Sequence, residues 1–127
     1  MFRFGKPKQK EIWEETPAAS MGDIEAAKMI RNICNSAATS AESFAGFFSR
    51  PDVRKKKHDA ERYDHAKKRA LEVAKSMSDE LLRDMAVRQI INLCLKANDV
   101  ETASVLIRAI ETEKIREEVL KEYPALR

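Results

Sequence analysis

The chain has 127 residues and a formal net charge of +3, which indicates one domain long enough to bury roughly two-thirds of its unfolded surface. No stretch approaches the ~20 consecutive apolar residues of a membrane-spanning helix, and the segment after Met1 lacks the apolar run of a signal peptide. Three Gly, four Pro and the absence of sustained strand-like alternation predict an all-α protein with short connections. We therefore expect a cytoplasmic protein with no membrane partner.

The N-terminal residues 1–19 have no regular period and are interpreted as a loosely ordered arm. They mix aromatic residues with Gly, Pro and basic side chains. Two interpretations stay open, a free arm and an arm in which Ile12 and Trp13 dock onto the helical body or onto a partner. Docking is favoured, because a lone exposed Trp is uncommon. Residues 20–127 form the predicted helical domain.

The first helical stretch runs from Ser20 to Ser49. Ser20 with Asp23 resembles a capping box, and apolar residues follow a helical period to Phe48. This stretch could form one helix or two. Two helices with a break near Ala38 are favoured, because residues 35–42 contain few strong helix formers besides alanine. The three phenylalanines near its end are expected to be the bulkiest part of the core: Phe44, Phe47 and Phe48.

A long surface helix is predicted next, because Ser49 and Pro51 mark a helix start and apolar residues then cover one face to Met77. Ser78 is expected to cap the helix that follows. That helix ends at Asn98 and Asp99, where Asp99 is a natural N-cap for a further helix. Thr112 offers another cap, and Pro124 ends the last helix.

Shifting the C-terminal segment back by 33 residues superimposes a similar pattern. Ala103 meets Ala70, and the turns coincide. Apolar residues meet at six further positions, namely Val73/Leu106, Ala74/Ile107, Met77/Ile110, Leu82/Ile115, Ala86/Val119 and Val87/Leu120. A period in the low thirties is the size of one helix–turn–helix repeat.

Lys96, Ala97, Asp99 and Ala103 resemble the inter-repeat turn of tetratricopeptide-like helical repeats. The resemblance covers about residues 70–123, although the chain lacks the family's Trp-Leu-Gly-Tyr signature and the Pro that usually closes a unit. It implies a short array of helical hairpins, either a right-handed solenoid or an irregular bundle. It also implies a non-enzymatic protein-interaction module, such as an adaptor, assembly partner or regulatory subunit. Another protein is thus the expected partner, and self-association stays open. The expected recognition groove is lined by Ala66, Ala70, Val73, Ala74, Val100, Ala103 and Ile107.

The alternative function is nucleic-acid association through a basic ridge on the long helix. Residues 50–75 hold ten Lys or Arg against five Asp or Glu, which indicates a positive face. The aromatic residues do not interleave with this face, and the net charge is modest for a nucleic-acid binder. We therefore favour a protein partner. The ridge consists of Arg54, Lys57, Arg62, Lys68, Arg69 and Lys75.

Metal binding and catalysis have little support in the sequence. His58, Glu61 and His65 share one side of the long helix at a spacing that could hold zinc, but the surrounding cations disfavour it. No phosphate-binding loop or nucleophile motif occurs. We therefore expect no catalytic residue, no metal and no cofactor. Cys34 and Cys94 are interpreted as buried small hydrophobic residues and not as a disulfide.

Overall fold

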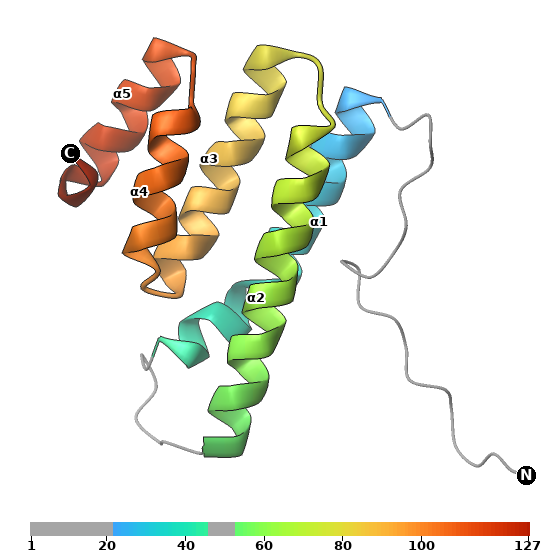
Figure 1. The fold of residues 1–127 in the computed structure, drawn as a ribbon, viewed down its shortest axis with the longest axis vertical. Coiled ribbons are helices and arrows are strands. Elements are labelled where there is room, and N and C mark those ends of the chain that lie inside the picture. The colour runs from blue at the N-terminus through green and yellow to red at the C-terminus, as the bar shows by residue number, and fades with distance from the viewer. Residues whose placement is uncertain (1–21, 46–52) are drawn as a thin grey trace, which may run out of the picture.

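The computed structural model describes residues 22–45 and 53–127, and every regular element within them is a helix. The all-α prediction is therefore confirmed for this part of the chain, which contains no strand. Five α-helices and a final 3-10 helix follow one another (Figure 1): α1 Asp23–Phe44, α2 Val53–Lys75, α3 Glu80–Lys96, α4 Val100–Ala109, α5 Glu113–Glu122 and η2 Pro124–Leu126.

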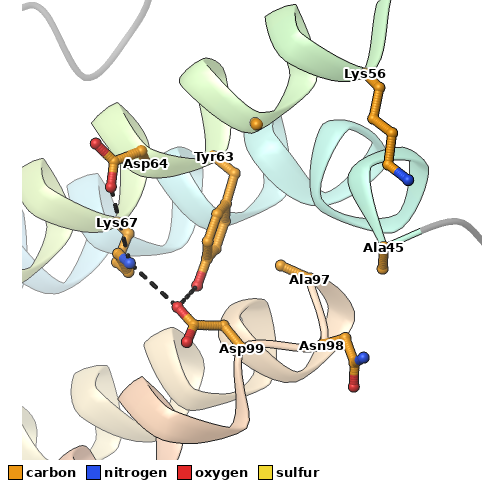
Figure 2. A pocket seen from close by; sticks show the side chains of 9 residues that line it. Ala45, Lys56, Tyr63, Asp64, Lys67, Ala97, Asn98 and Asp99 are labelled. Atoms are coloured by element: carbon orange, nitrogen blue, oxygen red, sulfur yellow. Dashed lines mark hydrogen bonds and ion pairs between the residues drawn. The ribbon is translucent and has the colours of Figure 1, made fainter. Parts of the chain in front are cut away.

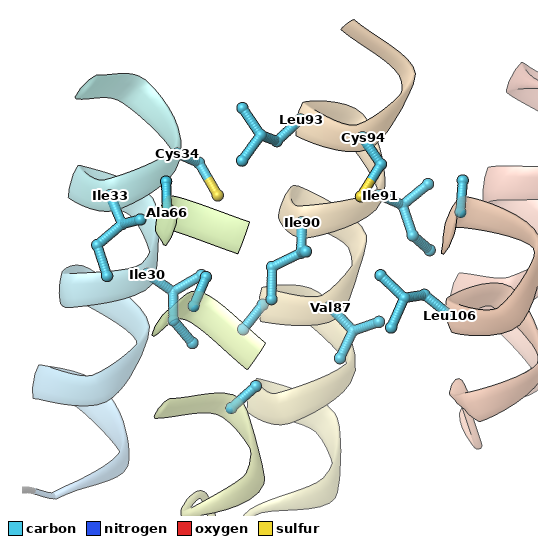
Figure 3. Packing of buried hydrophobic residues seen from close by; sticks show 14 of the residues in the cluster. Ile30, Ile33, Cys34, Ala66, Val87, Ile90, Ile91, Leu93, Cys94 and Leu106 are labelled. Atoms are coloured by element: carbon cyan, nitrogen blue, oxygen red, sulfur yellow. The ribbon is translucent and has the colours of Figure 1, made fainter. Parts of the chain in front are cut away.

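The helices form a row in which α2, α3, α4 and α5 succeed one another and α1 lies behind α2 (Figure 1). α1 packs along both α2 and α3, and α4 packs against α3. The core is aliphatic: Ile30 of α1 points toward Ile90 of α3, and Val87 of α3 points toward Leu106 of α4 (Figure 3). Ile30 and Ile90 are both fully buried, and burying such a side chain contributes about 1.5–3 kcal/mol.

The predicted break near Ala38 is wrong, because α1 runs unbroken from Asp23 to Phe44. Ala37 and Ala41 are fully buried in the faces of α1 that meet α2 and α3. Tertiary packing therefore overrides the weak helix propensity of this stretch. The side chain of Phe44, together with Phe47 and Phe48, lies outside the described residues.

Two predicted helix caps are also wrong. The N-cap of α1 is Gly22 and not Ser20, and residues 1–21, with the predicted arm, lie outside the described part of the chain. The N-cap of α3 is Asp79, whose carboxylate accepts a hydrogen bond from the Leu82 backbone N–H at 2.8 Å. An acid one residue later in the chain thus takes the role expected of Ser78.

The predicted turn at Asn98 and Asp99 is confirmed. Asn98 has a φ of 60°, a left-handed conformation that Asn tolerates and that often ends a helix. The backbone N–H of Asp99 then donates to the Cys94 carbonyl at 2.8 Å. The Asp99 carboxylate accepts from the Thr102 N–H at 3.2 Å and so caps α4.

Two features of the structure recur at the 33-residue spacing of the sequence pattern. The second helices of the two hairpins, α3 and α5, begin at Glu80 and Glu113. The corresponding positions Ala70 and Ala103 are both fully buried. The start of the second helix and one buried alanine therefore recur after 33 residues, whereas α4 and α5 do not pack together as closely as α2 and α3.

The α2–α3 turn and the α4–α5 turn are each held by a carboxylate from the helix that precedes the pair in the chain, an arrangement that we call the carboxylate clamp. Asp23 of α1 accepts the backbone N–H groups of Ser78 and Asp79 at 2.9 and 2.7 Å. Asp84 of α3 accepts those of Glu111 and Thr112 at 3.1 and 2.7 Å. The two pairs of amides occupy equivalent positions of the repeat.

Candidate functional site

The residues predicted to line the groove are mostly core residues. Val100 is 42% exposed, but the other six are at most 4% exposed: Ala66, Ala70, Val73, Ala74, Ala103 and Ile107. These side chains fill the contacts between neighbouring helices, so they do not form a surface that a partner reaches.

An open hollow lies beside α2, one to two helical turns before Ala66, where α2 extends past the α3–α4 turn. α2 has 23 residues and α4 has 10, so the N-terminal half of α2 has no part of α4 beside it (Figure 1). The hollow measures about 590 Å³. We call it the notch, and its lining residues are Ala45, Lys56, Ala60, Tyr63, Asp64, Lys67, Ala97, Asn98 and Asp99 (Figure 2).

A hydrogen-bonded network forms one end of the notch. The Tyr63 hydroxyl donates to Asp99 Oδ2 at 2.6 Å, and Lys67 Nζ donates to the same oxygen at 3.1 Å. Lys67 also lies 3.8 Å from Asp64 Oδ1 and 5.0 Å from the centre of the Tyr63 ring. Because Asp99 also caps α4, the network joins α2 to the start of α4.

The network fixes the protonation states of Asp99 and Tyr63. Burial opposes ionisation of Asp99, but hydrogen bonds from Tyr63, Thr102 and Lys67 outweigh it and hold the pKa of this carboxyl at about 2. Burial, with the hydrogen bond to Asp99, raises the pKa of Tyr63. At neutral pH, Asp99 is therefore an anion and Tyr63 a neutral donor.

The other end of the notch carries polar groups outside this network. Lys56 is exposed at the rim, and Asn98 is exposed in the α3–α4 turn. The small apolar side chains of Ala45 and Ala97 line the hollow between them (Figure 2). An ammonium group and a carboxamide beside small apolar side chains suit the binding of an extended polypeptide with an acidic side chain.

Sequence reasoning missed Tyr63 and Lys67, since it assigned Tyr63 only to an apolar face. The repeat itself contained a signal for them. Asp99 is the 33-residue equivalent of Ala66, and equivalent positions of adjacent units lie near one another in a stacked array. The residues one turn before and one position after Ala66 are Tyr63 and Lys67.

The basic ridge is interrupted. Its exposed members are Arg54, Lys57, Lys68 and Lys75, and Lys68 pairs with Asp64 at 2.9 Å. Arg62 reaches back to the Ser36 carbonyl at 3.4 Å, whereas Arg69 pairs with Glu72. At least three of the six predicted cations, Arg62, Lys68 and Arg69, therefore make contacts within the domain.

The remaining sequence candidates lie apart from the notch. His58, Glu61 and His65 are exposed, and no group of three or more potential metal ligands occurs within the described ranges. Cys34 and Cys94 are free and buried. Burial raises the pKa of their thiols to about 12 and about 11.

No helix in the described part of the chain is both long and apolar enough to cross a membrane. Comparisons of the chain with protein-family models, with curated proteins and with solved structures found no match in any of the three.

Proposed function

We propose that this protein is a non-enzymatic interaction module that binds an extended, acidic segment of another protein in the notch. The observation that carries the proposal is the combination of a hollow of about 590 Å³ with exposed polar groups at its rim. The Tyr63–Asp99–Lys67 network holds the walls in place before a partner arrives, which lowers the entropic cost of binding.

The charge distribution favours an acidic partner segment. Lys56 stands at the rim, and Arg54 and Lys57 are exposed on the same first turns of α2. These cations would attract a carboxylate-bearing segment and speed its association. The Asn98 carboxamide supplies both a donor and an acceptor, which match the groups of a peptide backbone.

Nucleic acid is a weaker second candidate. The exposed cations Arg54, Lys57, Lys68 and Lys75 support it, but three of the six cations predicted for the ridge make contacts within the domain. Replacing these four cations with Ser should leave the helical fold intact. A fall in nucleic-acid affinity at low salt, with a shallower dependence on salt, would support this candidate and count against the acidic peptide.

The proposal is tested by site-specific photo-crosslinking in the native cell. A photoreactive residue at Asn98 should give discrete adducts with a partner, and Lys56→Glu in the same protein should suppress them. The matched control is Lys121→Glu, which reverses an exposed charge on α5. A rim charge that contributes about 1.4 kcal/mol would change the affinity about tenfold.

Two outcomes contradict the proposal. One is that the photoreactive residue gives no adduct at Asn98 that is absent when it stands at Lys121. The other is that Lys56→Glu and Lys121→Glu reduce the adducts equally, which would show that the partner does not bind in the notch.

A further inference from the structure

Three large apolar side chains are exposed at the N-terminal ends of α1 and α3. Ile24 is 63% exposed, Leu81 52% and Met85 49%. Leu81 and Met85 are four residues apart and share one face of α3. The two helix ends are adjacent, because the Asp23 carboxylate binds the backbone just before α3. We call these three residues the apolar patch.

The apolar patch continues a groove between α1 and α3. A hollow of about 330 Å³ is lined from α1 by Arg31, Cys34, Asn35 and Ala38, and from α3 by Gln89, Asn92, Leu93 and Lys96. Ile24 lies two helical turns before Arg31, while Met85 and Leu81 lie one and two turns before Gln89. The patch is therefore the N-terminal end of this α1–α3 groove, which shares no lining residue with the notch.

The groove changes character along its length. Its N-terminal end is apolar, and the part that follows carries the cations Arg31 and Lys96. Lys28, one turn before Arg31, is also exposed. Lys96 lies 3.7 Å from Glu42, whereas no ion pair within the described ranges involves Arg31 or Lys28. A segment that fits must combine large apolar side chains with carboxylates.

We propose that the segment Glu11–Glu15 of the same chain docks in the α1–α3 groove. Its sequence, EIWEE, joins the apolar pair Ile12 and Trp13 to three carboxylates. Ile12 and Trp13 cover the apolar patch, and the carboxylates lie toward Lys28 and Arg31. Residues 1–21 are outside the described part of the chain, so the proposal rests on the groove, on this sequence and on the point of attachment.

The point of attachment favours an intramolecular occupant. The segment joins α1 through Gly22, the residue directly before α1 and two residues before Ile24 of the patch. The seven residues from Glu15 to Gly22 can span up to ~25 Å. A tether of this length gives an effective concentration on the order of millimolar, so a weak intrinsic affinity is sufficient for docking.

A second copy of the chain, paired through the same groove, is a poorer occupant. Self-pairing about a two-fold axis would bring the same surface of both copies together. The Arg31 and Lys28 side chains of the two copies would then face like charges, which is unfavourable.

Tryptophan fluorescence of the full chain tests the proposal, because the chain has one Trp and it is Trp13. In the wild type, Trp13 should emit at shorter wavelength and be quenched less by acrylamide than in the urea-unfolded chain. Met85→Lys should lower the ratio of docked to undocked segment about tenfold, because it removes apolar burial. Arg31→Glu should act in the same direction. The control is Val105→Lys, at a position 57% exposed on α4, which should leave Trp13 protected.

Circular dichroism first establishes that each variant keeps the helical content of the wild type. If acrylamide quenches Trp13 as strongly in the native chain as in the unfolded chain, the proposal is overturned. Protection that survives both Met85→Lys and Leu81→Lys overturns it as well. Protection lost on dilution together with a fall in molecular mass by sedimentation shows a second copy as the occupant, and this also overturns it.

Discussion

Asp84 offers the sharpest test of how the hairpin turns are held. Its side chain is fully buried, and one oxygen, Oδ2, accepts two backbone N–H groups at the start of α5. The other oxygen, Oδ1, is buried with no hydrogen-bond partner. Asp23 makes the same clamp at the preceding turn, but its hydrogen bonds are exposed to solvent. The same type of clamp therefore occurs twice, once buried at Asp84 and once exposed to solvent at Asp23.

The expected cost of removing Asp84 follows from these contacts. A hydrogen bond to a charged group contributes about 1.5–3 kcal/mol, and the two amides at the helix N-terminus also attract the negative charge. Relief of the buried carboxylate offsets part of this loss. Asp84→Ala should therefore destabilise the fold by about 3 kcal/mol. Asp23→Ala should cost only about 1 kcal/mol, because water replaces the lost acceptor.

Urea unfolding followed by circular dichroism measures both variants. A loss of about 3 kcal/mol is a large share of the 5–15 kcal/mol typical of a domain, and for this chain length it should lower the Tm by about 10 °C. Asp84→Asn, which keeps an acceptor oxygen, should lie between the wild type and Asp84→Ala. Equal losses for Asp84→Ala and Asp23→Ala would refute the role assigned to burial.

Three further predictions concern packing, acid stability and thiol reactivity. Ala103→Leu should cost about 1–3 kcal/mol by overpacking the fully buried contact of α4, whereas Ser104→Leu, at a half-buried position, should cost little; equal melting temperatures would contradict the register. The folded-state pKa of Asp99, about 2, lies below the unfolded value of ~3.9, so its contribution is present above pH ~5 and is lost as the pH falls toward 2. Titrating urea stability from pH 6 to 2 should show on the order of 1 kcal/mol more acid loss in the wild type than in Asp99→Asn, and parallel curves would argue against the network. Cys34 and Cys94, buried with raised pKa values, should react with a thiol reagent only after unfolding, and labelling of the native protein at the rate of a free thiol would contradict their burial.

The sequence predicted the helical content and the turn at Asn98 and Asp99 because both follow from local rules. Helical periodicity identifies the face of α4 that is buried, and Asn98 and Asp99 have strong intrinsic preferences for a turn. Ala70 and Ala103, at equivalent positions of the pattern, are both fully buried, and so they lie in the core and not in the expected recognition groove.

Local rules failed where contacts distant in sequence decide the outcome. The weak stretch around Ala38 is helical because of packing onto α2 and α3, which propensity does not include. The Asp23 clamp joins residues 55 and 56 positions apart, and the Tyr63–Asp99 hydrogen bond joins residues 36 apart. The groove residues expected from the sequence pattern are mostly buried between helices, and the pattern did not show that α2 extends past the α3–α4 turn.

The carboxylate clamps also have a direction. Each clamping Asp precedes the turn that it holds, since Asp23 comes before Ser78 and Asp84 before Thr112. During synthesis, the acceptor for each turn has therefore already left the ribosome when the turn emerges. The array is expected to assemble vectorially from its N-terminal end, with each finished helix serving as a template for the next hairpin.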